Sequence, residues 1–325
     1  MHSKQMFFAI ADKRYYSTSI PFIAHIQSSI LSKHGVRAGI LVRMGKFTKE
    51  LARMCEEHGI YLFVDNGAFD ILTKDILDKP IRNISKLRLW ALKVADFIAK
   101  QHTDVDGVAL PDVPVHGKEF VPRKERMDRI YTTAELHRLA VEHITKRDPE
   151  ALSKAVAVLQ GYEPGEYVAS LTLHQRNLPD EIASFYGEND VFGGVLAVGS
   201  VCVRKPSNAP SGRRSASGKG TNTLDQLMSF FMTSPVLKPY RFHFFGLHMT
   251  AFRKYWRYPR FASADTGGHG LDFRLKWRTI LKCSEPNAEC YNRALLLQVK
   301  RAGFITREEY WNLVHVDQIT LVHKR

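Results

Sequence analysis

Four side chains that could bind or react with a ligand follow short apolar runs of this chain. They are Asp65, Asp112, Gln160 and Asp265. An aspartate in such a place commonly caps a helix or closes an Asx-turn. Three carboxylates at one rim would repel each other, and a protein tolerates that cost mainly where it binds or transforms something. We therefore interpret the four residues as a candidate active site.

The chemistry of these side chains suits a purine base that is joined to a sugar. A carboxylate can accept hydrogen bonds from N1–H and the exocyclic amine of guanine, while a Gln amide or a backbone N–H of the Gly199-Ser200 turn can donate to O6. Phe69 and Tyr162 carry rings that could stack on a flat base. A further carboxylate could attack C1′ of the sugar and hold it as a glycosyl ester, as in retaining glycosidases.

Eight short apolar runs with helix-like segments between them would position these residues. The runs span 7–11, 38–42, 60–64, 107–110, 155–159, 194–198, 241–245 and 261–264. Several are continuously apolar, which is typical of parallel strands covered on both faces. The pattern predicts an α/β fold, a (β/α)₈ TIM barrel whose working residues lie past the carboxyl ends of the strands. An open doubly wound sheet is the competitor, but no glycine-rich phosphate loop follows the first run.

The predicted helices cover 47–58, 85–101, 132–145 and 222–233, with Thr48, Ser85, a Thr pair and Asn222 or Thr223 at their starts. Residues 271–315 also read as helical, with breaks near Ser284–Pro286 and Gly303. No internal repeat or second domain is evident. We therefore expect a single domain over 1–325, of which 271–325 form a helical C-terminal extension.

Composition indicates a polyanionic partner and no membrane. Lys and Arg number 47 against 33 Asp and Glu, a net charge of +14 with a pI near 9.6. No run of 18 apolar residues exists, and the apolar start is too short for a signal peptide. Four widely spaced cysteines in a chain this long suit a reducing compartment, so we expect a cytoplasmic protein.

Four basic stretches are candidate phosphate contacts: 118–129, 204–219, 253–260 and 274–282. The first three follow predicted strands, so we expect them to surround the mouth of the site. A solvated basic face is the alternative for each stretch. The nucleic-acid contacts predicted from the second and third stretches are Arg204, Lys205, Arg213, Arg214, Lys219, Arg253, Lys254 and Arg257.

An ordered set of short motifs resembles a known family. VDNGAF, LPDVP, VLQG, VLAVGSV, HFFGLH and SADT occur in this order over residues 60–270. Together they resemble the tRNA-guanine transglycosylase superfamily, and most closely its branch that places 7-deazaguanine bases in DNA. Each motif is weak alone, and the set is moderately specific.

The resemblance implies roles for individual residues. Asp265 would be the nucleophile that attacks C1′, and Asp65 the general acid and base at the reaction centre. Phe69 would stack on the base, while Asp112 would bind N1 and N2 and Gln160 would bind O6. Gly199 and Ser200 would line the base pocket with their backbone.

The chain departs from the family at several positions. Asn66 stands where a Ser is common, and Ser200 stands where the tRNA enzymes have Gly. Cys283, Cys290 and His315 resemble the family's zinc ligands in order and spacing, but one thiolate is missing from the four ligands that a structural zinc needs. We expect two buried helical cysteines and no required cofactor, with a structural zinc as the alternative.

The expected function is thus a pentosyltransferase reaction that exchanges guanine in DNA for a preQ0-like 7-deazaguanine, through a covalent aspartyl-glycosyl intermediate. Its partners would be DNA, the free base and other proteins of a DNA-modification system. A tRNA-guanine transglycosylase is one alternative, because nothing in the sequence reports on a 2′-hydroxyl. A non-catalytic nucleic-acid-binding protein and a barrel glycoside hydrolase are two others.

Overall fold

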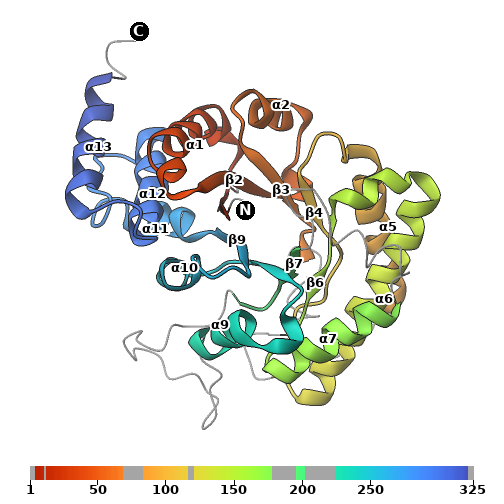
Figure 1. The fold of residues 1–325 in the computed structure, drawn as a ribbon. Coiled ribbons are helices and arrows are strands. Elements are labelled where there is room, and N and C mark those ends of the chain that lie inside the picture. The colour runs from red at the N-terminus through yellow and green to blue at the C-terminus, as the bar shows by residue number, and fades with distance from the viewer. Residues whose placement is uncertain are drawn as a thin grey trace.

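A computed structural model describes residues 4–10, 12–68, 83–115, 121–177, 195–201 and 224–320, without the side chains of His269, Leu271 and 315–320. Its centre is one parallel sheet with helices around it (Figure 1). The strands are β1 (Lys4–Ala9), β2 (Val36–Arg43), β3 (Tyr61–Asp65), β4 (Gly107–Ala109), β5 (Ala155–Val156), β6 (Val158–Leu159), β7 (Val195–Val198), β8 (Arg241–Phe244) and β9 (Phe261–Thr266). Every one of the eight predicted runs forms a strand.

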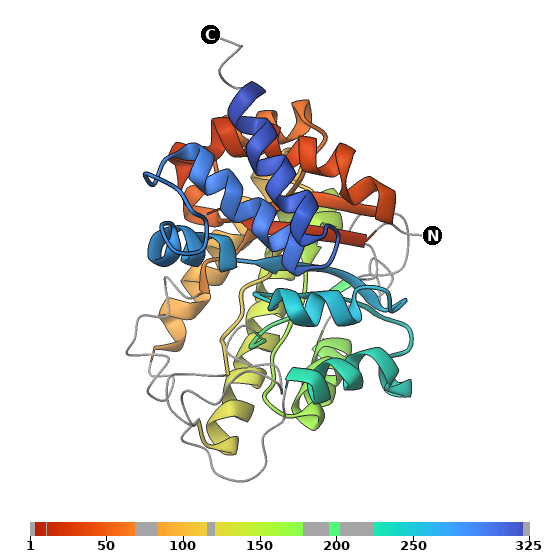
Figure 2. The ribbon, with the colours of Figure 1, turned by 90° about the vertical axis from the view of Figure 1, so that its left-hand side faces the viewer.

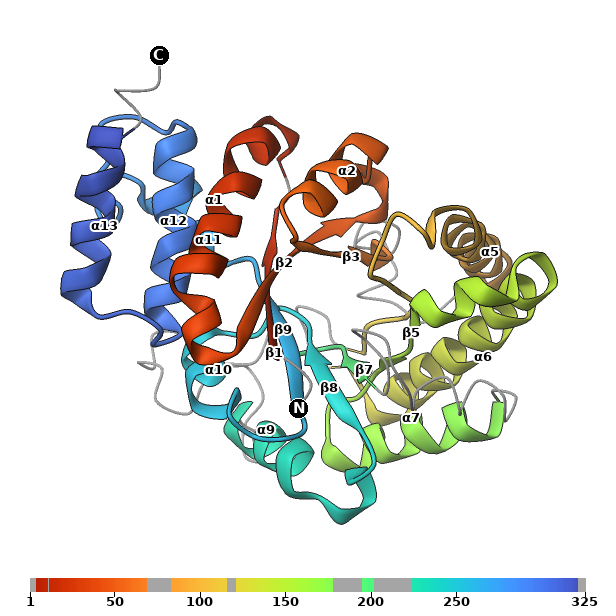
Figure 3. The ribbon, with the colours of Figure 1, turned by 45° about the horizontal axis from the view of Figure 1, so that its top comes forward.

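The two edge strands of the sheet, β5 and β6, both lie within the predicted run 155–159. The strand order is β5-β4-β3-β2-β1-β9-β8-β7-β6, so β5 and β6 are its opposite ends. Yet β5 and β6 are separated only by Ala157, and the predicted single strand 155–159 is therefore wrong in detail. Ala155 and Val156 pair with β4, whereas Val158 and Leu159 pair with β7. The sheet is thus barrel-shaped and nearly closed, and the predicted TIM-barrel-like fold is confirmed (Figure 3).

The helices lie on the outer surface of the barrel. They are α1 (Tyr16–Ser29), α2 (Lys49–Glu57), α5 (Ile84–Gln101), α6 (Arg123–Arg147), α7 (Pro164–Asn177), α9 (Leu224–Thr233), α10 (Met249–Tyr255), α11 (Gly268–Lys276), α12 (Ala288–Arg301) and α13 (Arg307–Thr320). Thr48 caps α2 as predicted, by accepting a hydrogen bond from Leu51 N. Asn83, and not Ser85, caps α5. Asn222 and Thr223 lie outside the described residues.

Helix α6 begins nine residues before the predicted start at Thr132, since its first residue is Arg123. The predicted breaks of the 271–315 segment near Ser284–Pro286 and Gly303 are confirmed, because residues 277–287 separate α11 from α12 and residues 302–306 separate α12 from α13, although the first interruption is longer than predicted. Helices α12 and α13 follow the last strand; α12 packs beside α1, and α13 packs on α12 (Figures 1 and 2). Among the described helices, none has both the length and the apolar surface needed to cross a bilayer.

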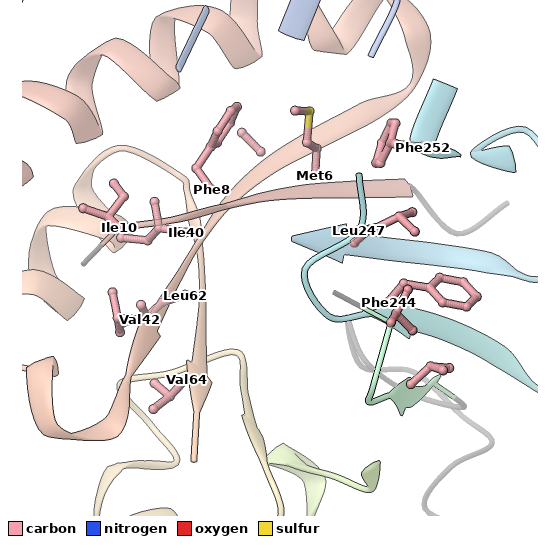
Figure 4. Packing of buried hydrophobic residues seen from close by; sticks show 14 of the residues in the cluster. Met6, Phe8, Ile10, Ile40, Val42, Leu62, Val64, Phe244, Leu247 and Phe252 are labelled. Carbon is pink, nitrogen blue, oxygen red and sulfur yellow. The ribbon is translucent and has the colours of Figure 1, made fainter. Parts of the chain in front are cut away.

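Alternation along the strands sorts the core into two layers. Phe7 and Phe63 belong to the smaller core cluster inside the barrel. Met6 and Phe8, on the same strand as Phe7, belong to the larger cluster and point out toward the helices (Figure 4). Phe7 fills the interior next to Gly39, where an added Cβ would lie 2.3 Å from the Phe7 ring. The barrel is therefore packed below its rim, and a ligand can only enter from the ends of the strands.

Candidate active site

The predicted site residues gather around one cavity at the carboxyl ends of the strands. The cavity has a volume of about 880 Å³, which lies in the upper part of the ~300–1,000 Å³ typical of ligand sites. Its lining includes six of the seven residues predicted for catalysis and base binding: Asp65, Asp112, Gln160, Gly199, Ser200 and Asp265. Phe69, the seventh, lies outside the described residues. Neighbouring strands thus bring together residues that are up to 200 positions apart.

Asp112 lies at the buried end of this cavity and is oriented by two amide groups. Asn66 Nδ2 donates to Asp112 Oδ1 at 2.6 Å and to the carbonyl of Leu110 at 2.7 Å, while Asn66 Oδ1 accepts from Ala68 N. Gln160 Nε2 donates to the other carboxylate oxygen, Oδ2. The sequence showed Asn66 only as a departure from a family pattern. The structure shows that Asn66 holds the Asp112 carboxylate in place.

Ser200 fixes which end of the Gln160 amide points toward Asp112. The Ser200 hydroxyl donates to Gln160 Oε1 at 2.6 Å, which leaves Nε2 as the group directed at the carboxylate. Gly199 makes room for this arrangement, because a Cβ there would lie 2.1 Å from Gln160 Nε2. Tyr167 OH donates to the Gly199 carbonyl at 2.9 Å and so anchors the turn. The Asp112 carboxylate, an acceptor, and the Gln160 amide N–H₂, a donor, consequently lie side by side in the cavity wall.

Asp265 enters the cavity from the end of β9 and is 5% exposed. Its Oδ1 accepts a hydrogen bond from Gly246 N at 2.8 Å. The same Oδ1 lies 3.5 Å from Nε2 of His243, a fully buried residue of β8. Sequence reasoning placed the HFFGLH motif at the site but did not single out His243. His243 lies within β8, where the sequence pattern does not distinguish a site residue from a core residue.

Two carboxyl groups of the cavity, those of Asp65 and Asp112, have raised pKa values. Burial raises the pKa of Asp65 to about 7, and the negative charges of Asp112 and Asp265 act in the same direction. Burial also raises the pKa of Asp112 to about 6, although the hydrogen bonds from Asn66 and Gln160 oppose the shift. Asp65 is therefore suited to hold a proton near neutral pH and to exchange it with a ligand.

Basic and aromatic residues also line the cavity. Tyr15 stacks on Tyr291 with 4.5 Å between ring centroids, and Phe273 meets both rings edge-on. The basic residues of the lining are Lys13, Arg14, Arg43, Lys46 and Arg274, and Arg14 pairs with Asp12, which also lines the cavity. We call the five basic and three aromatic residues the basic wall. Arg274 belongs to the predicted 274–282 stretch, and the others were missed. The DKRYY run after the first strand was the available signal.

The predicted nucleic-acid contacts divide into two groups. Arg204, Lys205, Arg213, Arg214 and Lys219 lie outside the described residues. Arg253 and Lys254 belong to α10 in the outer layer, and Lys254 pairs with Asp225 of α9. Arg257 lies in the turn before β9, and Lys4, at the start of β1, donates to the backbone of the same turn. The start of a strand is at the far end of the barrel, so the expectation that 253–260 surrounds the mouth is wrong.

The basic stretch 118–129 also differs from the expectation. Residues 121–129 are described, and two of their arginines are buried. Arg126 pairs with Glu166 at 2.7 Å, and Arg129 pairs with Glu125 and donates to the Pro114 carbonyl. These two arginines join α6 to its neighbours and are not available to phosphates. Arg123 and Lys124, at the start of the helix, are exposed.

Two cysteines of the suggested zinc set form a disulfide in the structure. Cys283, in the segment before α12, is bonded to Cys290 in its first turn. The expectation of unpaired cysteines is thus wrong for this pair. Sulfurs in a disulfide are not thiolate ligands, so this arrangement does not fit a zinc site. The side chain of His315 lies outside the described residues, within which no three His, Cys, Asp or Glu side chains are grouped for a metal.

Comparison with known protein families and with curated proteins finds no match to this chain. Its function therefore has to be argued from the cavity itself.

Proposed function

We propose that the protein exchanges a guanine base of a nucleic acid for a free 7-deazaguanine, by way of a covalent bond between Asp265 and the sugar. The observation that carries the proposal is the arrangement of one cavity. Asp112 and Gln160 present an acceptor beside a donor, and Asp265 lies in the wall of the same space. A site of this kind can hold a flat base by its edge while a carboxylate faces the carbon to which the base is attached.

The donor and acceptor order matches the Watson–Crick edge of guanine. That edge presents O6 as an acceptor, followed by N1–H and the N2 amine as donors. Gln160 Nε2 would donate to O6, and the Asp112 carboxylate would accept from N1–H and N2–H. Adenine presents a donor where guanine has O6, so the Gln160 amide group, held by Ser200, disfavours it. A 7-deazaguanine has the same edge and would bind in the same way.

The reaction would proceed in two halves that conserve protons. Asp265 attacks C1′, the C1′–N9 bond breaks, and the electron pair leaves with the base, which takes a proton from Asp65. The incoming base then returns a proton to Asp65 as its N9 attacks C1′, and the Asp265–C1′ bond breaks with its electron pair on the carboxylate. A pKa of about 7 lets Asp65 both give and receive this proton near neutral pH.

The basic wall supports a nucleic acid as the substrate. A free nucleoside would fill only part of a cavity of about 880 Å³. The phosphates on either side of the reacting nucleotide need cations, which the basic wall supplies at the cavity mouth. A base within a duplex cannot reach this depth, so it would be flipped out or come from a single strand. DNA is the proposed polymer, with tRNA as the alternative that the experiment separates.

The test supplies labelled 7-deazaguanine (preQ0) together with duplex DNA, single-stranded DNA or tRNA, and asks which polymer becomes labelled. We expect label in DNA and a protein–DNA adduct that survives denaturation. Asp265→Asn should lower exchange by on the order of 10⁴-fold or more and remove the adduct. Asp128→Asn, an exposed carboxylate of α6, is the matched control. Label in tRNA alone would replace DNA as the substrate, and exchange without Asp265 would refute the mechanism.

A further inference from the structure

His243 is a buried imidazole beneath the nucleophile that the reaction described above does not use. It is fully buried on β8 and points into the barrel. Phe7, Phe63 and Phe245 contact its ring edge-on, with centroid distances of 5.7, 4.9 and 4.7 Å. A histidine in an aromatic layer is costly unless its ring nitrogens have partners, because each buried polar atom without a hydrogen bond costs about 1–3 kcal/mol.

The two ring nitrogens of His243 differ in their surroundings. Nδ1 lies 2.9 Å from the Ser263 hydroxyl, a hydrogen bond within the barrel. Nε2 has no hydrogen bond in the described part of the chain, and it is 3.5 Å from Asp265 Oδ1. If Ser263 donates to Nδ1, the proton of a neutral imidazole is on Nε2, directed at the carboxylate. A buried donor without a partner, aimed at a reacting group, calls for a functional explanation.

We propose that His243 is a positioning residue that selects which oxygen of Asp265 attacks the sugar. Together with Gly246 N–H, His243 Nε2–H holds Oδ1 and leaves Oδ2 free toward C1′. The inference rests on the proposed function, because it assigns a role toward the nucleophile of that reaction. The 3.5 Å separation shortens to a hydrogen bond as the carboxylate aligns with the substrate.

The same contact has different strengths in the two halves of the reaction. Hydrogen bonds to an ionised carboxylate are about twice as strong as those to a neutral acceptor such as an ester carbonyl. His243 therefore stabilises Asp265 as the anion, which is the form that leaves when the Oδ2–C1′ bond breaks. Loss of His243 should slow this second half more than the first, and the covalent adduct should persist.

Two substitutions separate the hydrogen bond from the packing of the ring. His243→Phe keeps an aromatic ring without a donor, and His243→Gln places an amide N–H near the position of Nε2. We expect His243→Phe to lower kcat by roughly 10²- to 10³-fold, as the loss of one preorganised donor does in other active sites. The KM for the free base should change by less than about twofold, because Asp112 and Gln160 are untouched. His243→Gln should recover most of the rate.

Three results would overturn the proposal. These are an unchanged exchange rate in His243→Phe, equal losses in His243→Phe and His243→Gln with base binding intact, and an adduct that disappears as fast as in the wild-type protein. Thermal unfolding and binding of free guanine to each variant establish that the fold and the base pocket are retained. A variant that fails these controls is replaced by His243→Asn, whose amide lies near Nδ1 and which should not recover the rate.

A spectroscopic readout separates this inference from the proposed function. In protein labelled with ¹⁵N-histidine, the Nε2 signal of His243 should be that of a protonated nitrogen, and Asp265→Asn should shift it. A shift without any exchange activity in wild-type protein would support the contact and refute base exchange. If the protein exchanges bases but the Nε2 signal is unchanged in Asp265→Asn, base exchange is retained and the role of His243 is refuted.

Discussion

At the scale of single residues, the cavity brings three buried or partly buried carboxylates together. Asp65, Asp112 and Asp265 all line it, and only hydrogen bonds from amide groups offset the burial of Asp112. Carboxylates held in this way cost folding stability whenever they are ionised. Active sites commonly lower the stability of the fold in this way, because the buried ionisable groups that destabilise it are the groups that react.

Asp65→Asn should therefore stabilise the protein at high pH. The folded-state pKa of Asp65, about 7, lies above its ordinary value of 3.8, so the ionised side chain lowers stability progressively as pH rises through that window. Asparagine cannot ionise, and we expect the variant to gain roughly 1–2 kcal/mol at pH 8, after allowance for solvent screening. Urea unfolding at pH 8 and pH 4 measures the gain, which should nearly vanish at pH 4. Asp128→Asn should change neither value.

At the scale of elements, an ion pair between two helices holds the loop that follows Gln160. The Glu166 carboxylate, in the first turn of α7, pairs with Arg126 of α6 at 2.7 Å and accepts hydrogen bonds from the backbone N–H groups of Tyr162 and Glu163. Arg126 also lies over the Tyr162 ring. Sequence analysis assigned Arg126 to a phosphate-binding stretch, whereas the structure uses it to fix the position of a site loop.

Removal of one partner of this pair should be strongly destabilising. Glu166→Ala removes the nearest carboxylate from the buried Arg126 and leaves Glu163 at 3.7 Å, so we expect a loss of about 3–5 kcal/mol in the free energy of unfolding. The double substitution Arg126→Met, Glu166→Ala also removes the buried positive charge and should recover part of the loss. Chemical denaturation of the wild-type protein, the two single variants and the double variant is the measurement. A double variant as unstable as the sum of the two single variants would contradict the role of the pair.

At the scale of the whole molecule, charge is distributed unevenly around the cavity. The chain carries a net charge of +14, and the basic wall lines the same cavity as the three carboxylates. By contrast, Lys254 and Arg257 lie away from the lining residues, on the outer helical layer and in the turn before β9. A nucleic acid whose base enters the cavity would place its phosphates against the basic wall.

Salt dependence of nucleic-acid binding should distinguish these two surfaces. Lys13→Ala with Arg274→Ala should weaken binding of single-stranded DNA and reduce the slope of log K against log salt by about 1 per lost phosphate contact. Lys254→Ala with Arg257→Ala removes the same charge elsewhere and should leave the slope unchanged. Fluorescence anisotropy over a salt series measures both. An equal effect from the two pairs would indicate non-specific attraction to a basic protein.

The sequence alone predicted the barrel and six of the residues that line the candidate site. Continuous apolar runs such as 60–64 and 194–198 can be buried on both faces only in a parallel sheet that is covered by helices. Parallel strands bring their carboxyl ends to a common rim, so Asp65, Asp112 and Asp265 had to approach each other once the strands were placed. The pattern of apolar runs and the geometry of a parallel barrel are enough to predict this rim, because neither depends on which side chains contact each other.

Only the tertiary structure decided the partner of each side chain. The pairing of Gln160 with Asp112, the approach of His243 to Asp265 and the ion pair of Arg126 with Glu166 join residues 22–48 positions apart. The disulfide and the turn at 256–260 likewise depend on how α10, α11 and α12 pack on the barrel. The residue type determines which hydrogen bonds a side chain can donate or accept. Its neighbours in space determine whether it makes them to a ligand or to other groups of the protein.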